Sequence, residues 1–311
     1  MSAPLASIVI PCHNAARWLA ATLDSAFAQT WPNIEVILVD DGSTDDSLAL
    51  ARRYEGRGLR LFTQPNRGAA AARNNGLRAA RGEFIQYLDS DDLLAPDKIA
   101  QQMTLFADGS RTRLSSSTWA RFTHNPEEAV LVSMPNWRDL TGVEFLQLHF
   151  ETGGMMQPAA WLAPRALLDR AGPWNESLSL NDDGEYFARV MLAADEIRFC
   201  PSAKTYYRSQ VTGSLSSRKD HPALHSLYRS IDLTLAALLA ADRSPRTLAA
   251  AAHAWKWTAF ELYPGAPELS RRAEQNSRQL GGSRRPFPAG GRFQLASRFL
   301  GWRLAKRLTL S

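Results

Sequence analysis

The sequence predicts an α/β fold in which a mostly parallel sheet is flanked by helices and followed by a helical C-terminal extension. Over the first hundred residues, short apolar runs alternate with amphipathic stretches that have the helical period. The apolar runs are continuous, which is typical of parallel strands buried on both faces. An alanine- and leucine-rich helical pattern over residues 221–263 predicts the extension.

The expected elements follow in order along the chain. In the first part, strands are expected at residues 6–11, 35–40, 59–63 and 83–88, with helices at 15–29, 45–54 and 69–79 and a fourth entered at Pro96. Later strands are expected at 116–122, 129–134, 159–163, 197–200 and 205–208, with helices at 141–150, 164–170 and 181–194. Two prolines mark a linker at 281–291, before a basic amphipathic helix at 293–308.

Polar clusters follow the first four expected strands: PCHN, DDGSTD, QPNRG and DSDD. Right-handed crossovers place the C-terminal ends of parallel strands at one edge of the sheet, where such sheets bind ligands. Each cluster alone is compatible with an ordinary turn, since Asp, Asn, Gly and Pro favour turns. The convergence of four clusters on one edge favours a ligand site.

The Asp89-Ser90-Asp91-Asp92 cluster is the sharpest candidate site. Three carboxylates within four residues repel one another, and a bound cation would offset this repulsion. Mg²⁺ and Mn²⁺ prefer oxygen ligands, and Mg²⁺ is commonly held by one or two carboxylates together with substrate phosphates. The cluster therefore suits a substrate that carries a diphosphate. The alternative is a solvated acidic turn that caps the next helix.

Three further residues are candidates for nucleotide contacts. An aspartate at the end of the second strand, Asp40 or Asp41, can accept a hydrogen bond from a nucleobase imide or a ribose hydroxyl. For Asp41 we expect instead a cap on the following helix. Arg73 can direct its guanidinium at a diphosphate, or it can be an ordinary surface residue of its helix.

A second acidic site, Asp182-Asp183, lies at the expected start of a helix. A carboxylate at this position commonly caps the helix, which lowers the pKa of the carboxyl. A general base also has to be ionised, so capping and catalysis are compatible here.

Five blocks of this sequence together resemble family 2 of the inverting glycosyltransferases, which have the nucleotide-diphospho-sugar transferase (GT-A) fold: SIVIPCHN, VDDGSTD, QPNRGAAAARNNG, YLDSDD and DDGEYFAR. The blocks lie in the family's order within residues 6–210. The resemblance implies that Asp40 meets the nucleobase, that Asp89 lies near the ribose, and that Asp91, together with Asp89, holds Mg²⁺ or Mn²⁺. It makes Asp183 the catalytic base, with Asp182 in the place of the family's usual Glu. The residues expected to bind the nucleotide are Pro11, His13, Asn14, Asp40, Arg73, Asp89 and Ser90.

The resemblance implies an enzyme that moves a sugar from a UDP-, GDP- or dTDP-sugar to an acceptor hydroxyl with inversion. A saccharide or a lipid-linked acceptor is expected, as in cell-surface polysaccharide or glycolipid synthesis. Many family members have a Tyr-Arg-x-His segment whose His helps to hold the diphosphate or metal. Here Gln210 stands at that position and cannot supply positive charge. Two alternatives stay open: a nucleotidyltransferase of the same fold, and a degenerate domain that binds a nucleotide-sugar without turnover.

Two tryptophans are candidates for contact with the acceptor. Trp161 and Trp174 can stack on a sugar ring, with Asp182 beside the base and residues 153–157 shaping the pocket. Burial in an apolar core is the commoner role of such tryptophans.

The resemblance also implies a division of the chain. We expect a GT-A catalytic domain over residues 1–215, with a nucleotide-binding half up to about residue 110 and an acceptor half after it. A helical extension would cover residues 216–280, and the linker with the basic helix would cover 281–311.

The charge of the chain is unevenly distributed. The net charge is +5, but ten Arg and Lys residues against one Glu give residues 271–311 a charge of +9, which leaves −4 for the remainder. The basic amphipathic helix suits either an anionic membrane surface or packing on the protein's own domain. No nucleic-acid-binding motif accompanies it, so we expect no nucleic-acid partner.

The cysteines and the apolar runs predict where in the cell the protein is found. Cys12 and Cys200 form no CxxC pattern, which argues against a disulfide scaffold and fits a reducing compartment. No signal sequence or membrane-spanning run is recognisable. We expect a cytoplasmic protein, either free or peripheral at the inner face of the cell membrane.

Overall fold

The computed structural model describes residues 3–131, 133–154, 157–209, 218–287 and 289–309. Three residues that the sequence analysis considered lie outside the described residues: Met155 and Met156 of the expected acceptor stretch, and Gln210.

The N-terminal part forms a five-stranded sheet in the order β3-β2-β1-β4-β8. β1 (Ala6–Cys12) lies parallel to β2 (Ile34–Asp41) and to β4 (Phe84–Tyr87), and β2 lies parallel to β3 (Arg60–Gln64). The short β8 (Ala163–Pro164) pairs with β4 in the antiparallel direction. The predicted α/β fold with a mostly parallel sheet is confirmed.

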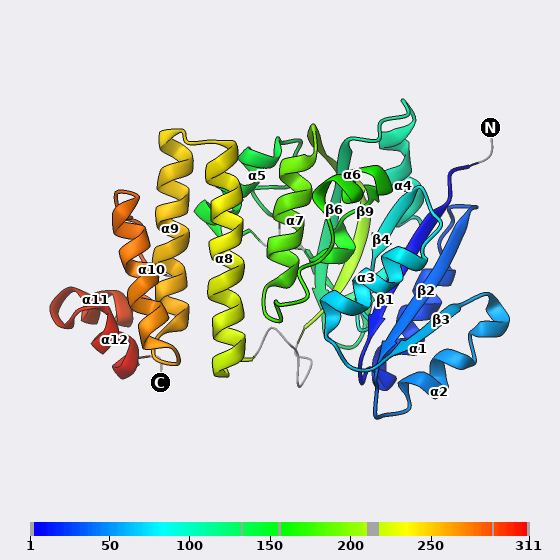
Figure 1. Ribbon diagram of the computed structural model, residues 1–311, viewed down its shortest axis with the longest axis horizontal. Coiled ribbons are helices and arrows are strands. Elements are labelled where there is room, and N and C mark those ends of the chain that lie inside the picture. The colour runs from blue at the N-terminus through cyan, green and yellow to red at the C-terminus, as the bar shows by residue number, and fades with distance from the viewer. Residues whose placement is uncertain (1–2, 132, 155–156, 210–217, 288, 310–311) are drawn as a thin grey trace.

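Helices cover both faces of this sheet (Figure 1). The helices on one face are α1 (Ala16–Phe27), α2 (Ser47–Arg52) and α4 (Lys98–Met103). The helices on the other face are α3 (Ala69–Ala79), α5 (Gly142–Thr152), α6 (Arg165–Ala171) and α7 (Asp182–Ala193). Gly76 lets α3 approach β1 closely, because an added Cβ at this position would lie 2.4 Å from Val9 Cγ1. Short 3₁₀ turns lie at Glu55–Arg57, Thr104–Phe106, Pro126–Glu128 and Pro158–Ala160.

A second, mixed sheet adjoins the first and has the order β5-β9-β6-β7. β9 (Glu196–Arg208) runs parallel to β6 (Arg113–Phe122), while β5 (Leu93–Leu94) and β7 (Val130–Leu131) pair at its edges in the antiparallel direction. Backbone hydrogen bonds of 3.0 and 3.1 Å between Ser115 and Leu162 connect β6 to the segment before β8.

Two strand predictions in this part were wrong. The sequence predicts a strand over residues 159–163, but only Ala163–Pro164 pair with β4. It also predicts separate strands at 197–200 and 205–208, whereas the structure has one strand, β9. The residues between them, 201–203, form a bulge opposite the step from Ser117 to Thr118. A bulge accommodates Pro201 because its nitrogen cannot donate a ladder hydrogen bond.

Helices α8 (His221–Ala241), α9 (Pro245–Leu262) and α10 (Pro267–Gln279) stand side by side next to α5 and α7 (Figure 1). Their apolar residues belong to the same core as those of α5 and α7. The helical pattern over 221–263 is divided at Ser244, whose side chain accepts a hydrogen bond from the Thr247 N–H at 3.3 Å. Such a cap, with a proline in the first turn, starts a new helix.

The last two helices lie at the end of the molecule opposite the parallel sheet (Figure 1). They are α11 (Gly291–Leu300) and α12 (Trp302–Thr309), so the prediction of one continuous helix over 293–308 was wrong. Gly301 separates them with a φ of +73°, a conformation that glycine adopts without strain. In the described part of the chain, no helix is both long enough and apolar enough to cross a membrane.

Candidate active site

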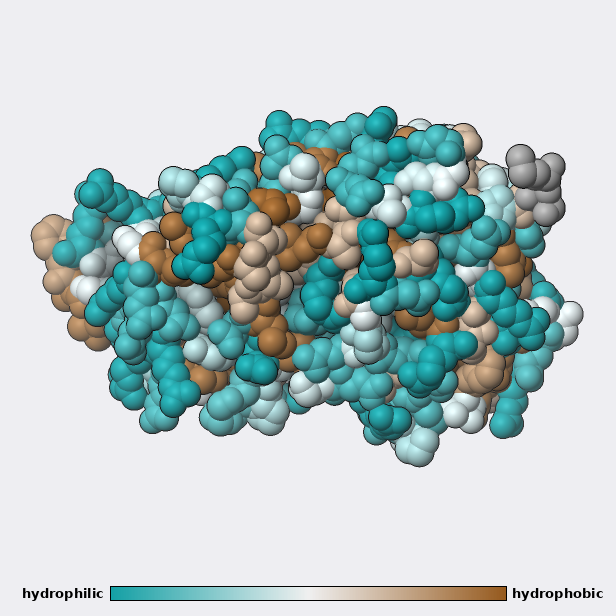
Figure 2. Space-filling view, turned by 45° about the horizontal axis from the view of Figure 1, so that its top comes forward, coloured by the Kyte–Doolittle hydropathy of each residue, from teal (hydrophilic) through white to brown (hydrophobic). Residues whose placement is uncertain are grey.

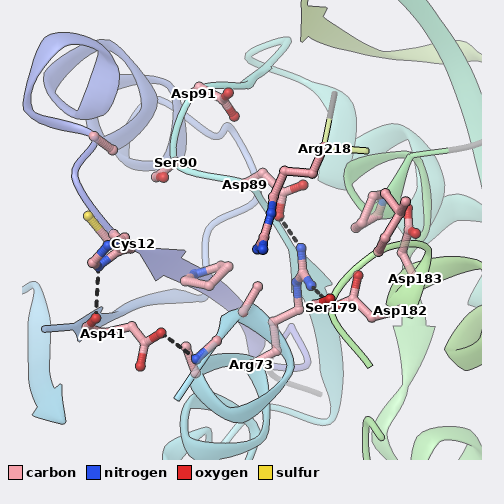
Figure 3. Close-up of a pocket in the computed structure, with 18 of the residues that line it drawn as sticks. Cys12, Asp41, Arg73, Asp89, Ser90, Asp91, Ser179, Asp182, Asp183 and Arg218 are labelled. Atoms are coloured by element: carbon pink, nitrogen blue, oxygen red, sulfur yellow. Dashed lines mark hydrogen bonds and ion pairs between the residues drawn. The ribbon is translucent and has the colours of Figure 1, made fainter. Parts of the chain in front are cut away.

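A cavity of about 1270 Å³ opens at the C-terminal edge of the parallel strands (Figure 3). All four predicted polar clusters contribute to its lining, and so does the start of α7. The residues predicted to bind the nucleotide that line it are Pro11, His13, Asn14, Arg73, Asp89 and Ser90.

Asn14 connects the first polar cluster to the second. Its φ of +50° lies in the left-handed region, which Asn tolerates better than most residues. Its side-chain oxygen accepts hydrogen bonds from the backbone N–H groups of Thr44 at 2.8 Å and Asp45 at 3.3 Å. His13 Nδ1 lies 2.9 Å from the carbonyl oxygen of Asp41. The two loops together form one wall of the cavity.

The end of β2 presents Asp41, and not Asp40, to the cavity. The Asp41 carboxylate accepts three hydrogen bonds of 2.8 Å, from Gln64 Nε2 and from the N–H groups of Arg67 and Gly68. Asp41 thus fixes the third polar cluster, and the prediction that it caps the following helix was wrong.

Asp40 points into the protein instead. It is 2% exposed, and its Oδ2 accepts a hydrogen bond from the Ser43 N–H at 3.2 Å. Among the described residues, Asp40 Oδ1 has no hydrogen-bond partner. The two aspartates differ because successive residues of a strand point to opposite sides.

Arg73 joins the two acidic sites. Its Nη2 lies 2.7 Å from Asp89 Oδ1, and its Nη1 lies 3.0 Å from Asp182 Oδ2 (Figure 3). The guanidinium also lies 4.4 Å from the centroid of the Trp174 ring, and the residue is 5% exposed. Burial disfavours the charged form of Arg73, but the two carboxylates raise its pKa overall. Arg73 therefore holds both acidic sites at the cavity wall, and its two terminal nitrogens are already paired.

The DSDD loop is held in place from behind. Thr22 Oγ1 donates to the carbonyl oxygens of Ser90 at 3.0 Å and Asp92 at 2.9 Å. Asp92 is buried and accepts the Arg208 N–H at 2.8 Å, while Arg208 Nε donates to the Asp91 carbonyl oxygen at 2.8 Å. Asp89, Ser90 and Asp91 remain at the cavity.

Arg208 is a contributor that the sequence analysis did not assign. Its guanidinium lies 4.2 Å from the ring centroids of both Trp18 and Phe122, so it is sandwiched between β6 and α1. Its place in the Tyr-Arg segment was visible in the sequence, but its contact with the DSDD loop arises only from the folding of β9 beside that loop.

The DSDD loop fits a divalent cation that is shared with a substrate. Burial raises the pKa of Asp91 to about 6, and the neighbouring charge of Asp89 adds to this shift. Within the described ranges, no three His, Cys, Asp or Glu side chains converge as a complete metal site. Asp91 and Asp89 can provide part of a coordination shell, and donor phosphates would provide the rest, as is common for Mg²⁺.

The second acidic site lies across the cavity from Asp91 (Figure 3). Asp183 accepts the N–H of Gly184 at 2.9 Å and forms no ion pair within the described residues. Burial raises the pKa of both carboxyl groups, to about 6 for Asp182, and the charge of Arg73 opposes the shift in each case. The two neighbours therefore differ in their partners: Asp182 is paired with Arg73, and Asp183 has no ion pair among the described residues.

Two serines of α8 hold the loop that precedes Asp182. Ser226 Oγ accepts the N–H groups of Ser179 at 2.8 Å and Leu180 at 3.0 Å. Ser230 Oγ donates to the carbonyl oxygen of Asn181 at 2.6 Å and accepts from its Nδ2 at 2.7 Å. The serines are spaced i and i+4 on one helix face. This link between the helical extension and the acidic site has no recognisable signal in the sequence.

The two tryptophans predicted at the acceptor do not line the cavity. Trp161 is 2% exposed, with its ring centroid 5.4 Å from Phe145 and 5.5 Å from Phe187. Trp174 stacks on Tyr186 at 4.0 Å, beneath Arg73. Both belong to the apolar core between the helices and the sheet. Of the two roles that the sequence left open for these tryptophans, the structure bears out the commoner one, burial in the core, and it contradicts contact of Trp161 with an acceptor sugar. A single sequence does not say which face of a segment is buried.

Other residues line the cavity in their stead. Gln157, from the expected acceptor stretch, is at the lining, and its Nε2 donates to Thr205 Oγ1 at 2.6 Å. Arg218 and Lys219, just before α8, bring two cations to the lining, and the Arg218 side chain extends into the cavity (Figure 3). Arg218 Nε also donates to Asp220 Oδ2 at 2.8 Å.

Comparison with known proteins identifies the family. Residues 7–157 match the profile of the family described as Glycosyl transferase family 2. An Escherichia coli protein, UDP-Glc:alpha-D-GlcNAc-diphosphoundecaprenol beta-1,3-glucosyltransferase WfaP, is 30% identical over 218 residues, which cover 69% of this chain and 81% of that protein. The chain belongs to glycosyltransferase family 2. The predicted resemblance is confirmed.

Other relatives, also named as glycosyltransferases, match over a shorter region. An uncharacterized glycosyltransferase of Haemophilus influenzae is 44% identical over 106 residues, which are 33% of this chain. The chain spans 42% of the length of that protein and 32% of the length of a Rickettsia typhi glycosyltransferase. The region shared with each of these two relatives therefore covers less than half of this chain and less than half of the relative.

Two solved structures have a similar fold. Staphylococcus aureus TarS 1-349, solved with UDP-GlcNAc, superposes with a TM-score of 0.66 at 18% identity, over 93% of this chain and 95% of that one. The mannosyltransferase PcManGT of Pyrobaculum calidifontis, solved with GDP-Man and Mn²⁺, gives a TM-score of 0.59 at 18% identity, over 100% of this chain and 84% of that one. These similarities support the GT-A fold.

Proposed function

We propose that this family 2 chain is an inverting, metal-assisted glycosyltransferase that moves a sugar from a nucleotide-diphospho-sugar to an acceptor hydroxyl. One observation carries the proposal: a single cavity holds the DSDD loop and Asp183, and Arg73 is paired with a carboxylate from each acidic site. An acidic loop suited to a metal, opposite a carboxylate that forms no ion pair with any described residue, favours transfer over a domain that only binds nucleotide-sugar.

The nucleotide would lie along the polar loops of the parallel sheet. We assign contact with the nucleobase to Asp41, in place of Asp40, because its carboxylate is the one at the cavity. Asp41 Oδ2 accepts one hydrogen bond from the protein and retains a lone pair for a base N–H. Asp89 and Ser90 would meet the ribose. The UDP-GlcNAc and GDP-Man complexes of the two structural neighbours support a donor of this class.

The diphosphate would lie between the DSDD loop and the start of α8. Asp91, with Asp89, would hold Mg²⁺ or Mn²⁺, and such an ion supplies Lewis-acid stabilisation of the leaving group when bound. The Mn²⁺ complex of the Pyrobaculum enzyme supports this assignment. Arg218 and Lys219 would add the positive charge that Gln210 cannot supply.

Asp183 is the proposed general base. It accepts the proton of the acceptor hydroxyl while the acceptor oxygen bonds to the anomeric carbon, on the face opposite the diphosphate. The bond from that carbon to the diphosphate oxygen breaks, and its electron pair leaves with the nucleoside diphosphate. Configuration at the carbon inverts, through a transition state that resembles the oxocarbenium ion of glycoside hydrolysis. Asp182 orients the site through Arg73.

The proposed acceptor is a lipid-linked saccharide. The name of the Escherichia coli relative, which specifies GlcNAc-diphosphoundecaprenol, supports an acceptor of this type. Transfer would then take place in the cytoplasm, at the inner face of the cell membrane, in the synthesis of a surface polysaccharide or glycolipid. In this proposal residues 1–110 provide most contacts to the donor, Arg218 and Lys219 add contacts to its diphosphate, and the later part of the catalytic domain binds the acceptor.

Thermal unfolding in the presence of nucleotides tests the proposal. UDP, GDP, dTDP and CDP are each added with and without Mn²⁺. We expect one diphosphate to raise Tm in a metal-dependent manner, since ligand at a hundred times its Kd stabilises a protein by about 2.7 kcal/mol. Asp91→Asn should lose the metal-dependent part of the shift, and Asp183→Asn should keep it. A well-folded protein that responds to no nucleotide would contradict the proposal.

A further inference from the structure

An apolar surface lies exposed at the end of the molecule formed by α11 and α12. Figure 2 shows hydrophobic residues gathered at this end. We name this surface the distal face; its large apolar residues are Leu295, Phe299, Leu300, Leu304 and Leu308. Phe299 is 81% exposed, Leu308 63% and Leu295 61%. Exposed apolar side chains that cluster in this way are typical of an interaction surface.

The opposite side of the helix pair is fixed to the protein. Phe293 is 1% exposed, and its ring lies 5.4 Å from that of Phe260 on α9. Arg303 Nη2 lies 2.8 Å from Glu274 Oε2 on α10. The pair is therefore held by one side only, and the residues of the distal face take no part in that packing. The sequence left two roles open for this segment, packing on the protein and binding to an anionic membrane. One side of the helix pair packs on the protein, and the other side remains available for a membrane.

The charges of the segment that carries the distal face have one sign. From residue 284 to the end, the sequence contains seven Arg and Lys residues and no Asp or Glu. Arg292, Arg298 and Arg307 are exposed, and in the described ranges none of them forms an ion pair. Exposed cations that flank exposed apolar side chains match the anionic head groups and acyl chains of a lipid interface.

We propose that the distal face inserts its apolar side chains into the interface of a membrane that contains anionic lipid. Charge complementarity favours this partner over a second copy of the chain, because a symmetric dimer would bring two cationic surfaces together. Membrane binding would bring the enzyme to a lipid-linked acceptor, and this purpose rests on the proposed function. The binding itself requires neither donor nor turnover.

Sedimentation with vesicles tests the proposal on the full chain. The vesicles contain phosphatidylcholine alone or phosphatidylcholine with phosphatidylglycerol. We expect the protein to sediment with the anionic vesicles, to sediment far less with neutral ones, and to be released progressively by salt, because salt screens the attraction.

Three double variants separate the contributions. Leu295→Ser with Phe299→Ser should weaken binding to anionic vesicles on the order of tenfold or more, because two inserted apolar side chains are lost. Arg292→Gln with Arg298→Gln should weaken binding and reduce its dependence on salt. Val130→Ser with Leu131→Ser is the matched control: these side chains are 63% and 51% exposed on β7, in the second sheet, and their loss should leave binding unchanged.

Two results would overturn the inference: a wild-type chain that does not sediment with anionic vesicles, or a Leu295/Phe299 variant that sediments like the wild type. Circular dichroism and the Tm shift with nucleotide should be the same in all variants, since the altered side chains are exposed. A chain that binds vesicles but responds to no nucleotide would refute the proposed function alone. A chain that responds to nucleotide but ignores anionic vesicles would refute the membrane proposal alone.

Discussion

The cavity and the distal face both combine cations with apolar surface, but the cations have different partners. In the cavity wall, Arg73 is 5% exposed and has two carboxylate partners. At the distal face, Arg292 and Arg298 are exposed, and among the described residues they have no ion-pair partner. A buried, paired charge fixes the geometry of a site, whereas an exposed, unpaired charge is available to a partner outside the protein. The two regions are therefore expected to respond differently to mutation.

The largest effect is expected for Asp183→Asn. The amide cannot accept the proton of the acceptor, so kcat should fall by about 10² to 10⁴, the usual contribution of a general base. Nucleotide affinity should change little. Transfer to a saccharide acceptor and calorimetric binding of the nucleoside diphosphate measure the two quantities, and Asp169→Asn on α6 is the control. A parallel loss of nucleotide affinity would contradict the assignment of the base.

The next effect compares the two regions directly. Arg73→Gln leaves Asp89 and Asp182 without their buried cation and should lower the free energy of unfolding by roughly 3 kcal/mol. Arg298→Gln at the distal face should change it by less than about 0.5 kcal/mol, as surface substitutions usually do. Urea unfolding measures both. Equal effects of the two substitutions would mean that pairing and burial do not distinguish these regions.

A smaller effect is expected from the serines of α8. Ser226→Ala with Ser230→Ala removes hydrogen bonds to the loop before Asp182 and should cost about 1–2 kcal/mol of stability. It should also lower kcat while nucleotide affinity stays the same. Ser270→Ala is the matched control, because this buried serine donates to the Ala259 carbonyl oxygen at 2.7 Å away from the cavity. If kcat falls in the same proportion to the lost stability in the Ser226/Ser230 variant and in the Ser270 variant, a positioning role for Ser226 and Ser230 is contradicted.

The smallest effect is a shift in pH dependence. Burial raises the pKa of Asp183, and only its ionised form can accept a proton. The value of kcat/KM should therefore fall as the pH is lowered through this raised pKa, above the usual range of aspartate. Because Arg73 lowers the pKa of Asp183, Arg73→Gln should move the acid limb to higher pH. Initial rates across mildly acidic to neutral pH measure both profiles, and an unchanged limb in the variant would contradict this coupling.

The cavity was largely predictable because its signals are local. Each polar cluster follows its own strand, and parallel strands bring such ends to one edge whatever the rest of the chain does. The sequence assigned the nucleobase contact to Asp40, whereas the aspartate that lines the cavity is Asp41. The side that each aspartate faces depends on the exact strand register at the end of β2. For Trp161 and Trp174 the sequence left cavity and core both open for a similar reason: whether an aromatic side chain meets a cavity or a core depends on the element packed against it.

The sequence by itself determined the α/β fold class, the edge of the sheet that carries the site, and the basic character of the C-terminal segment. These properties depend on periodicity, composition and strand direction, which are properties of neighbouring residues. The tertiary structure decided which of two adjacent aspartates faces the cavity and which side of α11 and α12 stays exposed. It also brought Arg73 into contact with both acidic sites, the farther of which, at Asp182, lies 109 positions along the chain from Arg73. Each of these depends on contacts between residues distant in the chain, and such contacts exist only after the elements have packed together.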